Sequence, residues 1–96
     1  MKTLQEIESV VCEVFSVTSE FVHEKRNGQN RSTYRYIITY LSRVINGRFI
    51  TFEQIGKYFE MSSQPMNYGY NSIIDAACYD QILRENINEC LKNLQK

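Results

Sequence analysis

Apolar residues recur at helical spacing along most of the chain, and polar or turn-forming residues separate the runs. In the first run the apolar residues stand three or four positions apart, which is typical of one buried helix face. Thr3 and Glu6 just before it have the spacing of a capping box. The pattern therefore predicts a helix from Leu4 to Phe15, with these inward residues: Leu4, Ile7, Val11, Val14 and Phe15.

The same spacing, together with cap and turn signals, predicts further helices. Thr18 or Ser19 can cap the second, and Thr51 with Gln54 repeats the capping-box pattern ahead of the fourth. Asn27-Gly28-Gln29-Asn30 predicts a turn, and Asn46-Gly47 predicts a helix end. The predicted helices cover residues 20–25, 33–45, 52–59 and 71–84, followed by a stripe of Ile87, Cys90, Leu91 and Leu94.

The chain is therefore predicted to be all-α, with five to six helices. In the later helices the pattern places Val44, Ile74, Cys78 and Ile82 on inward faces and leaves His23 in solvent. Gly56 is expected to permit a close approach between helices. With four glycines and one proline in 96 residues, the chain is too poor in turn-forming residues for a β-sandwich.

Length and composition favour one folded domain, residues 1–96, of ordinary globular type. The chain is 43% hydrophobic and 23% charged. Its start alternates apolar residues with Glu6, Glu8 and Glu13, unlike a signal peptide, and no apolar run has the length of a membrane span. We expect a cytoplasmic protein that does not enter a membrane.

Positive charge is concentrated in one part of a chain whose formal net charge is zero. Residues 25–52 contain no Asp or Glu, yet they hold five of the six arginines. A basic block of this kind indicates a one-sided surface for phosphate, although a solvated cationic face without a partner is the alternative. The basic residues in the block are Lys25, Arg26, Arg31, Arg35, Arg43 and Arg48.

Two predicted helices within residues 48–75 suggest a helix-turn-helix, spanning about residues 51–84. The first is the helix from Phe52 to Phe59, and the second begins near Asn71. Between them Ser62, Ser63, Pro65 and Gly69 interrupt the periodicity over about ten residues. In such motifs the second helix enters a DNA groove.

Several stretches of the sequence match, in the same order, the motifs of one protein family. YRYIITYLSRVI, residues 34–45, and TFEQIGKYF, residues 51–59, resemble A-R-Q-I-A-M-Y-L-S-R-E-L and S-L-x-E-I-G-x-x-F of the C-terminal DNA-binding domain of the bacterial replication initiator DnaA. Upstream, IESVVCEVFSVTSEFVHEKR resembles the family's opening segment. YNSIIDA, residues 70–76, stands where the family has H-T-T-V-L-H-A.

The resemblance implies a Trp-repressor-like helical fold that binds duplex boxes at a replication origin. By position, Lys25 and Arg26 match the family's basic pair, Arg35 matches its phosphate-contacting arginine, and Arg43 matches a basic position of the same helix. Arg31 substitutes for basic residues that follow the pair. The base-contacting His-Thr-Thr is replaced by Tyr70, Asn71 and Ser72.

Two family features are absent from the sequence. EMSSQPMNYG, residues 60–69, stands where the family has Gly-Gly-Arg-Asp, so any sequence preference should differ from that of the family. The chain also has no P-loop, and we therefore expect no bound nucleotide.

Catalytic and metal-binding constellations are not apparent in the sequence. Cys12, Cys78 and Cys90 are widely spaced and lie in apolar patterns, which favours buried reduced thiols, and His23 is the only histidine. We expect no enzyme activity, no catalytic residue, no metal and no cofactor.

Duplex DNA is the leading expected partner. Affinity would come from the basic block, together with base readout by Tyr70, Asn71 and Ser72. An alternative is a protein-interaction module that kept the fold and uses Ser62–Gly69, which carries Met66 and Tyr68. A lesser option is stacking of tyrosines such as Tyr34, Tyr36 and Tyr40 on single-stranded bases.

Overall fold

Helices form almost the whole of the described chain. A computed structural model describes residues 2–24 and 29–95, with the side chains of residues 29–31 left out. Six α-helices and one 3-10 helix account for these residues, and the predicted all-α class is confirmed. They are α1 (Leu4–Phe15), α2 (Ser19–His23), α3 (Gln29–Asn46), η1 (Gly47–Phe49), α4 (Phe52–Tyr58), α5 (Ser63–Tyr79) and α6 (Gln81–Leu94).

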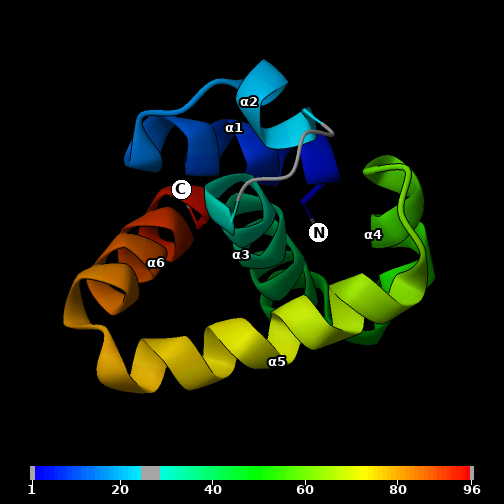
Figure 1. The fold of residues 1–96 in the computed structure, drawn as a ribbon. Helices are drawn as coiled ribbons and strands as arrows, with labels where there is room; N and C mark the ends of the chain where they lie inside the picture. The colour runs from blue at the N-terminus through cyan, green and yellow to red at the C-terminus, as the bar shows by residue number, and fades with distance from the viewer. Residues whose placement is uncertain (1, 25–28, 96) are drawn as a thin grey trace.

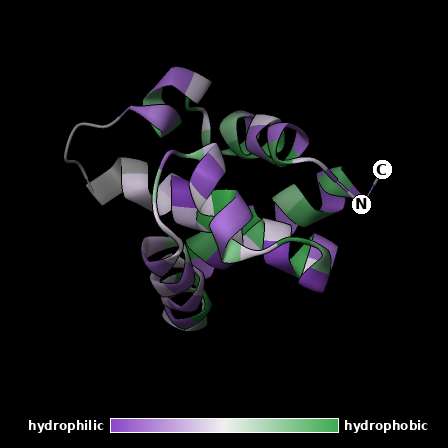
Figure 2. Cartoon of the chain, turned by 90° about the vertical axis from the view of Figure 1, so that its right-hand side faces the viewer, coloured by the Kyte–Doolittle hydropathy of each residue, from purple (hydrophilic) through white to green (hydrophobic). Residues whose placement is uncertain are grey.

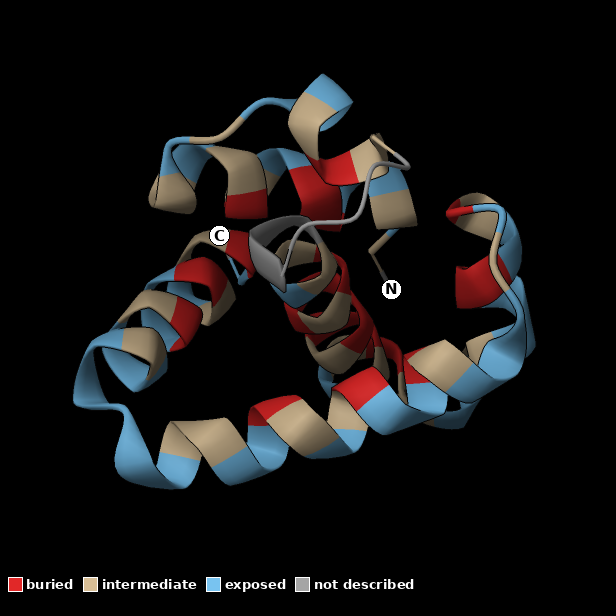
Figure 3. Cartoon of the chain, viewed as in Figure 1, coloured by how far each residue is buried: buried red, intermediate tan, exposed pale blue. Residues whose placement is uncertain are grey.

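Helix α3 occupies the centre of the fold. In Figure 1 it runs between α1 and α2 on one side and α5 on the other. Its Ile37, Ile38 and Leu41 are fully buried, and buried positions recur along the helix in Figure 3. Thr39 and Ser42 are also buried, and each hydroxyl donates to a carbonyl oxygen one turn earlier, which satisfies the polar group within the core.

Apolar side chains from the surrounding helices complete the core. Figure 2 shows hydrophobic and hydrophilic positions alternating around the helices, as expected for helices that each bury one face. The buried hydrophobic residues are Ile7, Val11, Val22, Ile37, Ile38, Leu41, Ile55, Phe59, Met66, Ile73, Ile87, Cys90 and Leu94.

Local capping signals were predicted correctly. Thr3 with Glu6 and Thr51 with Gln54 both form capping boxes, and the Thr18 side chain accepts from the amide of Phe21. These side chains satisfy amides that have no partner within their own helices. At the end of α3, Gly47 adopts a φ of +58°, as the Asn46-Gly47 pair predicts.

Two of the predicted helices have boundaries that differ from the structure. Gln29 and Asn30 belong to α3 and not to a turn, while Asn27 and Gly28 lie outside the described residues. The single helix predicted over residues 71–84 is wrong at both ends. Helix α5 begins at Ser63, and a new helix begins after Asp80, whose carboxylate accepts from the amide of Leu83 at 3.0 Å. Aspartate is a favoured N-cap, so it separates two helices despite the continuous apolar spacing.

Four residues predicted to point inward are exposed. They are Val44, Ile74, Cys78 and Ile82, and Ile82 has 72% of its surface accessible. Periodicity identifies the apolar face of a helix, but the neighbouring helices decide how much of that face is covered. Cys78 and Ile82 stand at the end of α5 and the start of α6, which meet at a corner beyond the core (Figure 1), and there the coverage is incomplete.

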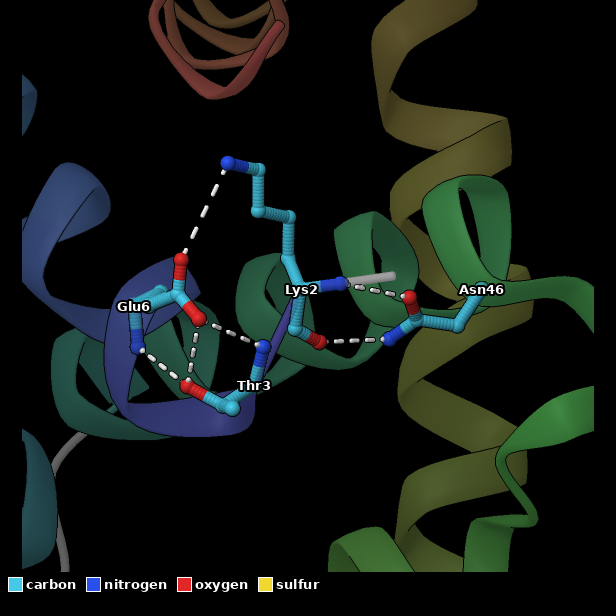
Figure 4. A network of polar contacts seen from close by, with 4 residues as sticks. All are labelled: Lys2, Thr3, Glu6 and Asn46. Carbon is cyan, nitrogen blue, oxygen red and sulfur yellow. Dashed lines mark hydrogen bonds and ion pairs between the residues drawn. The ribbon is translucent and has the colours of Figure 1, made fainter.

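Asn46 connects the end of α3 to the start of the chain. Its side-chain amide donates to the Lys2 carbonyl at 2.9 Å, and its oxygen accepts from the Lys2 amide at 3.0 Å (Figure 4). Asn46 is buried, so this reciprocal pair satisfies both polar atoms of its amide. It holds the N-terminal segment in place just before the capping box of α1.

Gly69 allows α5 to lie close against α3. A Cβ atom at this position would lie 2.0 Å from Cδ1 of Tyr36, which is a severe steric clash. The close approach also brings the ring of Tyr36 within 6.3 Å of the ring of Tyr68, edge to face. A glycine that interrupts a helical pattern in the sequence is therefore a packing requirement of this helix pair.

Among the described residues, no helix is both long and apolar enough to cross a membrane.

Candidate nucleic-acid interface

A four-residue connection, Phe59 to Ser62, joins α4 to α5. The amide of Met61 donates to the carbonyl of Gly56 at 2.7 Å, and the amide of Glu60 donates to that of Lys57 at 3.1 Å. Glu60 has a φ of +58°. This pair of bonds around one left-handed residue is the Schellman motif, which ends a helix and reverses the chain. The prediction of a turn-rich run of about ten residues is therefore wrong.

Gly56 makes room for this turn. A Cβ atom there would lie 2.6 Å from the carbonyl oxygen of Met61 and 2.8 Å from that of Ser62, both main-chain atoms. The close approach expected at Gly56 is thus made by the turn that follows α4. Gly56 is itself buried.

The early start of α5 changes where the predicted reading residues lie. Ser63–Gly69 forms the first two turns of the helix, with Ser62 as its N-cap. Tyr70, Asn71 and Ser72 therefore lie in later turns of α5. The prediction that the helix starts near Asn71 is wrong. Pro65 does not disrupt α5, because amides in the first turn of a helix have no partner within it.

Tyr70 is a packing residue in the structure. Its ring stacks on Tyr40 of α3 at a centroid distance of 5.9 Å and lies 5.5 Å from the ring of Phe52 in α4. Three helices therefore meet at this side chain. Ser72 is half-buried, whereas Asn71 is exposed, and its side-chain amide donates to the carbonyl of Asn67 at 3.0 Å.

The tyrosines of α3 are likewise engaged in packing. Tyr34 lies edge to face with Phe15 and Phe21, and Tyr36 with Tyr68. All three α3 tyrosines are half-buried. These rings join α3 to its neighbours, which accounts for aromatic residues within the basic block.

Arg35, a member of the basic block, is buried and does not face solvent. Only 8% of its surface is accessible. Its Nε donates to the Val22 carbonyl at 2.7 Å, its Nη2 donates to the Glu24 carbonyl, and its Nη1 lies 3.8 Å from the sulfur of Met61. The guanidinium thus joins α3 to the end of α2. Glu24 directly precedes Lys25-Arg26 in the sequence.

Arg43 and Arg48 differ in how accessible their side chains are to a phosphate group. Arg43 is half-buried; its Nη1 donates to the carbonyls of Gly47 and Ile50, and its guanidinium lies 4.7 Å from the centre of the Phe52 ring. It therefore braces the connection between α3 and α4. Arg48 in η1 and Lys57 in the last turn of α4 are both exposed.

For three members of the basic block, the side chains lie outside the described part of the structure. Lys25 and Arg26 lie outside the described residues. Arg31 belongs to α3 by its main chain alone.

A polar cluster around Glu8 was not predicted from the sequence. Glu8 is buried and accepts from the hydroxyls of Ser19 and Tyr58, and Nε2 of His23 lies 2.8 Å from its Oε1. His23 is therefore not directed to solvent. The signal was present, because Glu8 stands four residues after Leu4 and three before Val11, within the apolar stripe.

The cluster changes the protonation equilibria of its members. Burial alone would raise the pKa of Glu8, but hydrogen bonds from Ser19, Tyr58 and His23 outweigh it and lower that pKa. Burial and the hydrogen bond to Glu8 raise the pKa of Tyr58. The carboxylate holds α1, α2 and α4 together as a charged acceptor.

The thiols occupy different environments. Cys90 is buried, which raises its pKa to about 12, and Cys12 is half-buried, which also raises its pKa. Cys78 is exposed, so the expectation of a buried thiol is wrong for that residue. Among the residues that the structure describes, no group of His, Cys, Asp and Glu could hold a metal ion.

Known proteins similar to this chain were found among replication initiators. The chain is 32% identical over 92 residues to the chromosomal replication initiator protein DnaA of Campylobacter jejuni subsp. jejuni and of Campylobacter jejuni subsp. doylei. The match covers 95% of this chain, which spans only 20% of the length of each relative. No family model matches the chain.

Near-complete coverage of this chain and partial coverage of the relatives are what a shared domain produces. The similarity also confirms the likeness to DnaA that the sequence motifs indicate. The chain is therefore homologous to a segment of the replication initiator DnaA and forms a DnaA-like domain.

Proposed function

We propose that this chain binds double-stranded DNA, with α4 and α5 acting as a helix-turn-helix. The observation that carries the proposal is the short turn between them, closed by the bonds from Met61 to Gly56 and from Glu60 to Lys57. Helix-turn-helix motifs use a connection of this length, and the N-terminal turns of the second helix contact base edges. Homology to part of a replication initiator supports the same conclusion.

The packing of α5 suits this role. Met66, Gly69 and Ile73 face the core, so the opposite face of the helix is presented to solvent (Figure 3). Tyr40 of α3 and Phe52 of α4 pack against Tyr70 of α5, and these ring contacts support the helix. A reading helix placed on a rigid support loses little conformational entropy on binding.

Phosphate contacts would come from exposed cations near this helix pair. Arg48 precedes α4 and Lys57 ends it, and both are exposed. Lys25, Arg26 and Arg31 remain proposed phosphate contacts on the strength of their charge. Arg35 and Arg43 would act indirectly, because their guanidinium groups bond main-chain carbonyls and thereby position neighbouring segments.

Titrating a fluorescent duplex at several salt concentrations tests the proposal. Binding should weaken with salt, and Arg48→Gln or Lys57→Gln should each lower the slope of log K against log salt by about one. Lys92→Gln, an exposed lysine near the end of α6, is the matched control and should leave the slope unchanged. Absence of any binding at low salt would rule the proposal out.

A protein-binding role is the second candidate, and a specific surface favours it. Tyr79 and Ile82, at the corner between α5 and α6, are 89% and 72% accessible. Exposed apolar groups of this size are common at protein interfaces. Ser62–Gly69, the segment that the sequence offers for a protein partner, is helical from Ser63 onward. Self-association in sedimentation that Ile82→Ser abolishes, without duplex binding, would support this role.

A further inference from the structure

Three side-chain amides form a stripe along the exposed face of α5. Gln64, Asn67 and Asn71 are spaced three and four residues apart, and all three are exposed. Tyr68 lies beside them with 69% of its surface accessible. The opposite face carries the buried residues Met66, Gly69 and Ile73. The stripe begins at the second residue of α5, within the turn that a helix-turn-helix protein directs at base edges.

No charged residue lies within the stripe, and the first one on this face is Asp75, one turn beyond Asn71. The sequence from Met61 to Ile74 contains no Asp, Glu, Lys or Arg. A face that binds phosphate needs cations, and a face that is only solvated in a domain of this composition normally carries charges. Uncharged amides at three successive positions of one face are better suited to hydrogen bonding with base edges.

The chemistry of an amide distinguishes adenine from guanine. A Gln or Asn side chain offers one donor and one acceptor side by side, and adenine offers an N7 acceptor beside an N6 donor in the major groove. Guanine offers two acceptors there, so the amide oxygen would face a carbonyl oxygen. The stripe therefore favours adenine over guanine at the positions that it reaches.

One internal contact arranges part of the stripe. The Asn71 amide nitrogen donates to the Asn67 carbonyl at 3.0 Å and lies 3.3 Å from the Asn67 side-chain oxygen. That nitrogen carries two hydrogens, and the carbonyl and side-chain oxygens of Asn67 accept both of them. The longer bond, at 3.3 Å, is exchanged for a bond to a base, while the Asn71 oxygen can accept. The contact holds the Asn71 side chain against the helix before DNA arrives, which lowers the entropy lost on binding.

The length of the stripe matches a short run of base pairs. Seven residues separate Gln64 from Asn71, which at about 1.5 Å per residue corresponds to about 10 Å along the helix. Successive base pairs stand about 3.4 Å apart, so the stripe spans about three of them.

We propose that Gln64, Asn67 and Asn71 read adenine in the major groove, and that this chain prefers duplexes with adenines clustered over about three base pairs. The inference rests on the proposed binding of α5 to duplex DNA. Tyr70 and Ser72 are half-buried and are not part of the exposed stripe, whereas Gln64, Asn67 and Asn71 are exposed.

The test begins with selection of the full chain on a randomised duplex pool. Adenines in the selected duplex are then replaced, one at a time, by 7-deazaadenine, which lacks the N7 acceptor but still pairs with thymine. At a position read by an amide, we expect the affinity to fall roughly 3- to 10-fold, because one of two bonds is lost. Gln64→Ala and Asn67→Ala should each abolish the effect at one position.

Asn88→Ala, which removes an exposed amide from α6, is the matched control and should leave the selected sequence and the 7-deazaadenine effect unchanged. Alanine is a strong helix former, so circular dichroism should show intact helices in all three variants. Duplex binding that is indifferent to base composition and to 7-deazaadenine would overturn the adenine inference and leave the proposed function standing. Failure to bind any duplex at low salt would overturn both.

Discussion

The main-chain amide of Met61 donates to the carbonyl of Gly56 at 2.7 Å, and this bond places the start of α5 at Ser63. It closes the turn within four residues of α4. Residues 63–69, which the sequence predicts to lie in a turn-rich run, consequently form the first two turns of α5. The amide stripe, rather than Tyr70, thereby becomes the exposed face of the helix.

Gly56→Ala should destabilise the fold through this turn. The new methyl group would lie 2.6 Å from one main-chain oxygen and 2.8 Å from another, and the turn cannot shift without breaking its hydrogen bonds. We expect a loss of about 1–3 kcal/mol in the free energy of unfolding, measured by urea denaturation. An unfolding midpoint equal to that of the unmodified protein would contradict this account of the turn.

Glu60→Gly should stabilise the protein. Glu60 adopts a φ of +58°, a region that costs side-chain-bearing residues about 1 kcal/mol and glycine very little. We expect a gain of up to about 1 kcal/mol, reduced by the greater entropy of glycine in the unfolded chain and by the loss of the interaction that Glu60 makes. The same substitution at the exposed Glu53 within α4 is the control and should cost about 0.5–1 kcal/mol. If both substitutions changed the free energy of unfolding in the same direction, this would count against the Schellman turn.

Arg35→Lys should reduce stability although it conserves charge. The buried guanidinium reaches the carbonyls of Val22 and Glu24, and a lysine ammonium cannot reproduce that planar set of donors. A buried carbonyl left without its partner costs about 1–3 kcal/mol, which a thermal or urea unfolding curve would report. Unchanged stability together with weaker DNA binding would instead indicate a direct phosphate contact.

Glu8→Gln should destabilise the junction of α1, α2 and α4. Ser19, Tyr58 and His23 all approach Glu8 as donors, and an amide would turn an N–H group toward at least one of them. We expect a loss of about 1–3 kcal/mol at pH 7. The exposed Glu13 on the same helix is the control, and Glu13→Gln should change stability by less than about 0.5 kcal/mol.

The pH dependence of stability gives a second readout for Glu8. Its pKa is lower in the folded protein than the ordinary value of about 4.3 in an unfolded chain. The carboxylate therefore contributes stability above that ordinary value, and the contribution is lost as the pH falls through the folded pKa. Unfolding measured between pH 7 and pH 3 should depend less on pH in Glu8→Gln. A pH dependence that is identical in both proteins would contradict the role assigned to Glu8.

Local chemistry was enough to predict much of this fold from the sequence. The capping boxes at Thr3 and Thr51 and the helix end at Gly47 depend on residues within one turn of each other, so their outcome does not require knowledge of distant contacts. The all-α class and the DnaA-like character were predicted for a related reason. They rest on periodicity and on motifs whose residues are close together in the chain.

Contacts between distant segments decided the rest. Gly69 and Pro65 suggest a loop when considered alone, but Tyr36 requires a glycine opposite it, and a proline in the first turn of a helix sacrifices no hydrogen bond. The outward or inward direction of Arg35 depended on carbonyls more than ten residues away. Helical periodicity states which residues share a face. Only the packing of α3 against α2 and α5 determined which faces remain open to a partner.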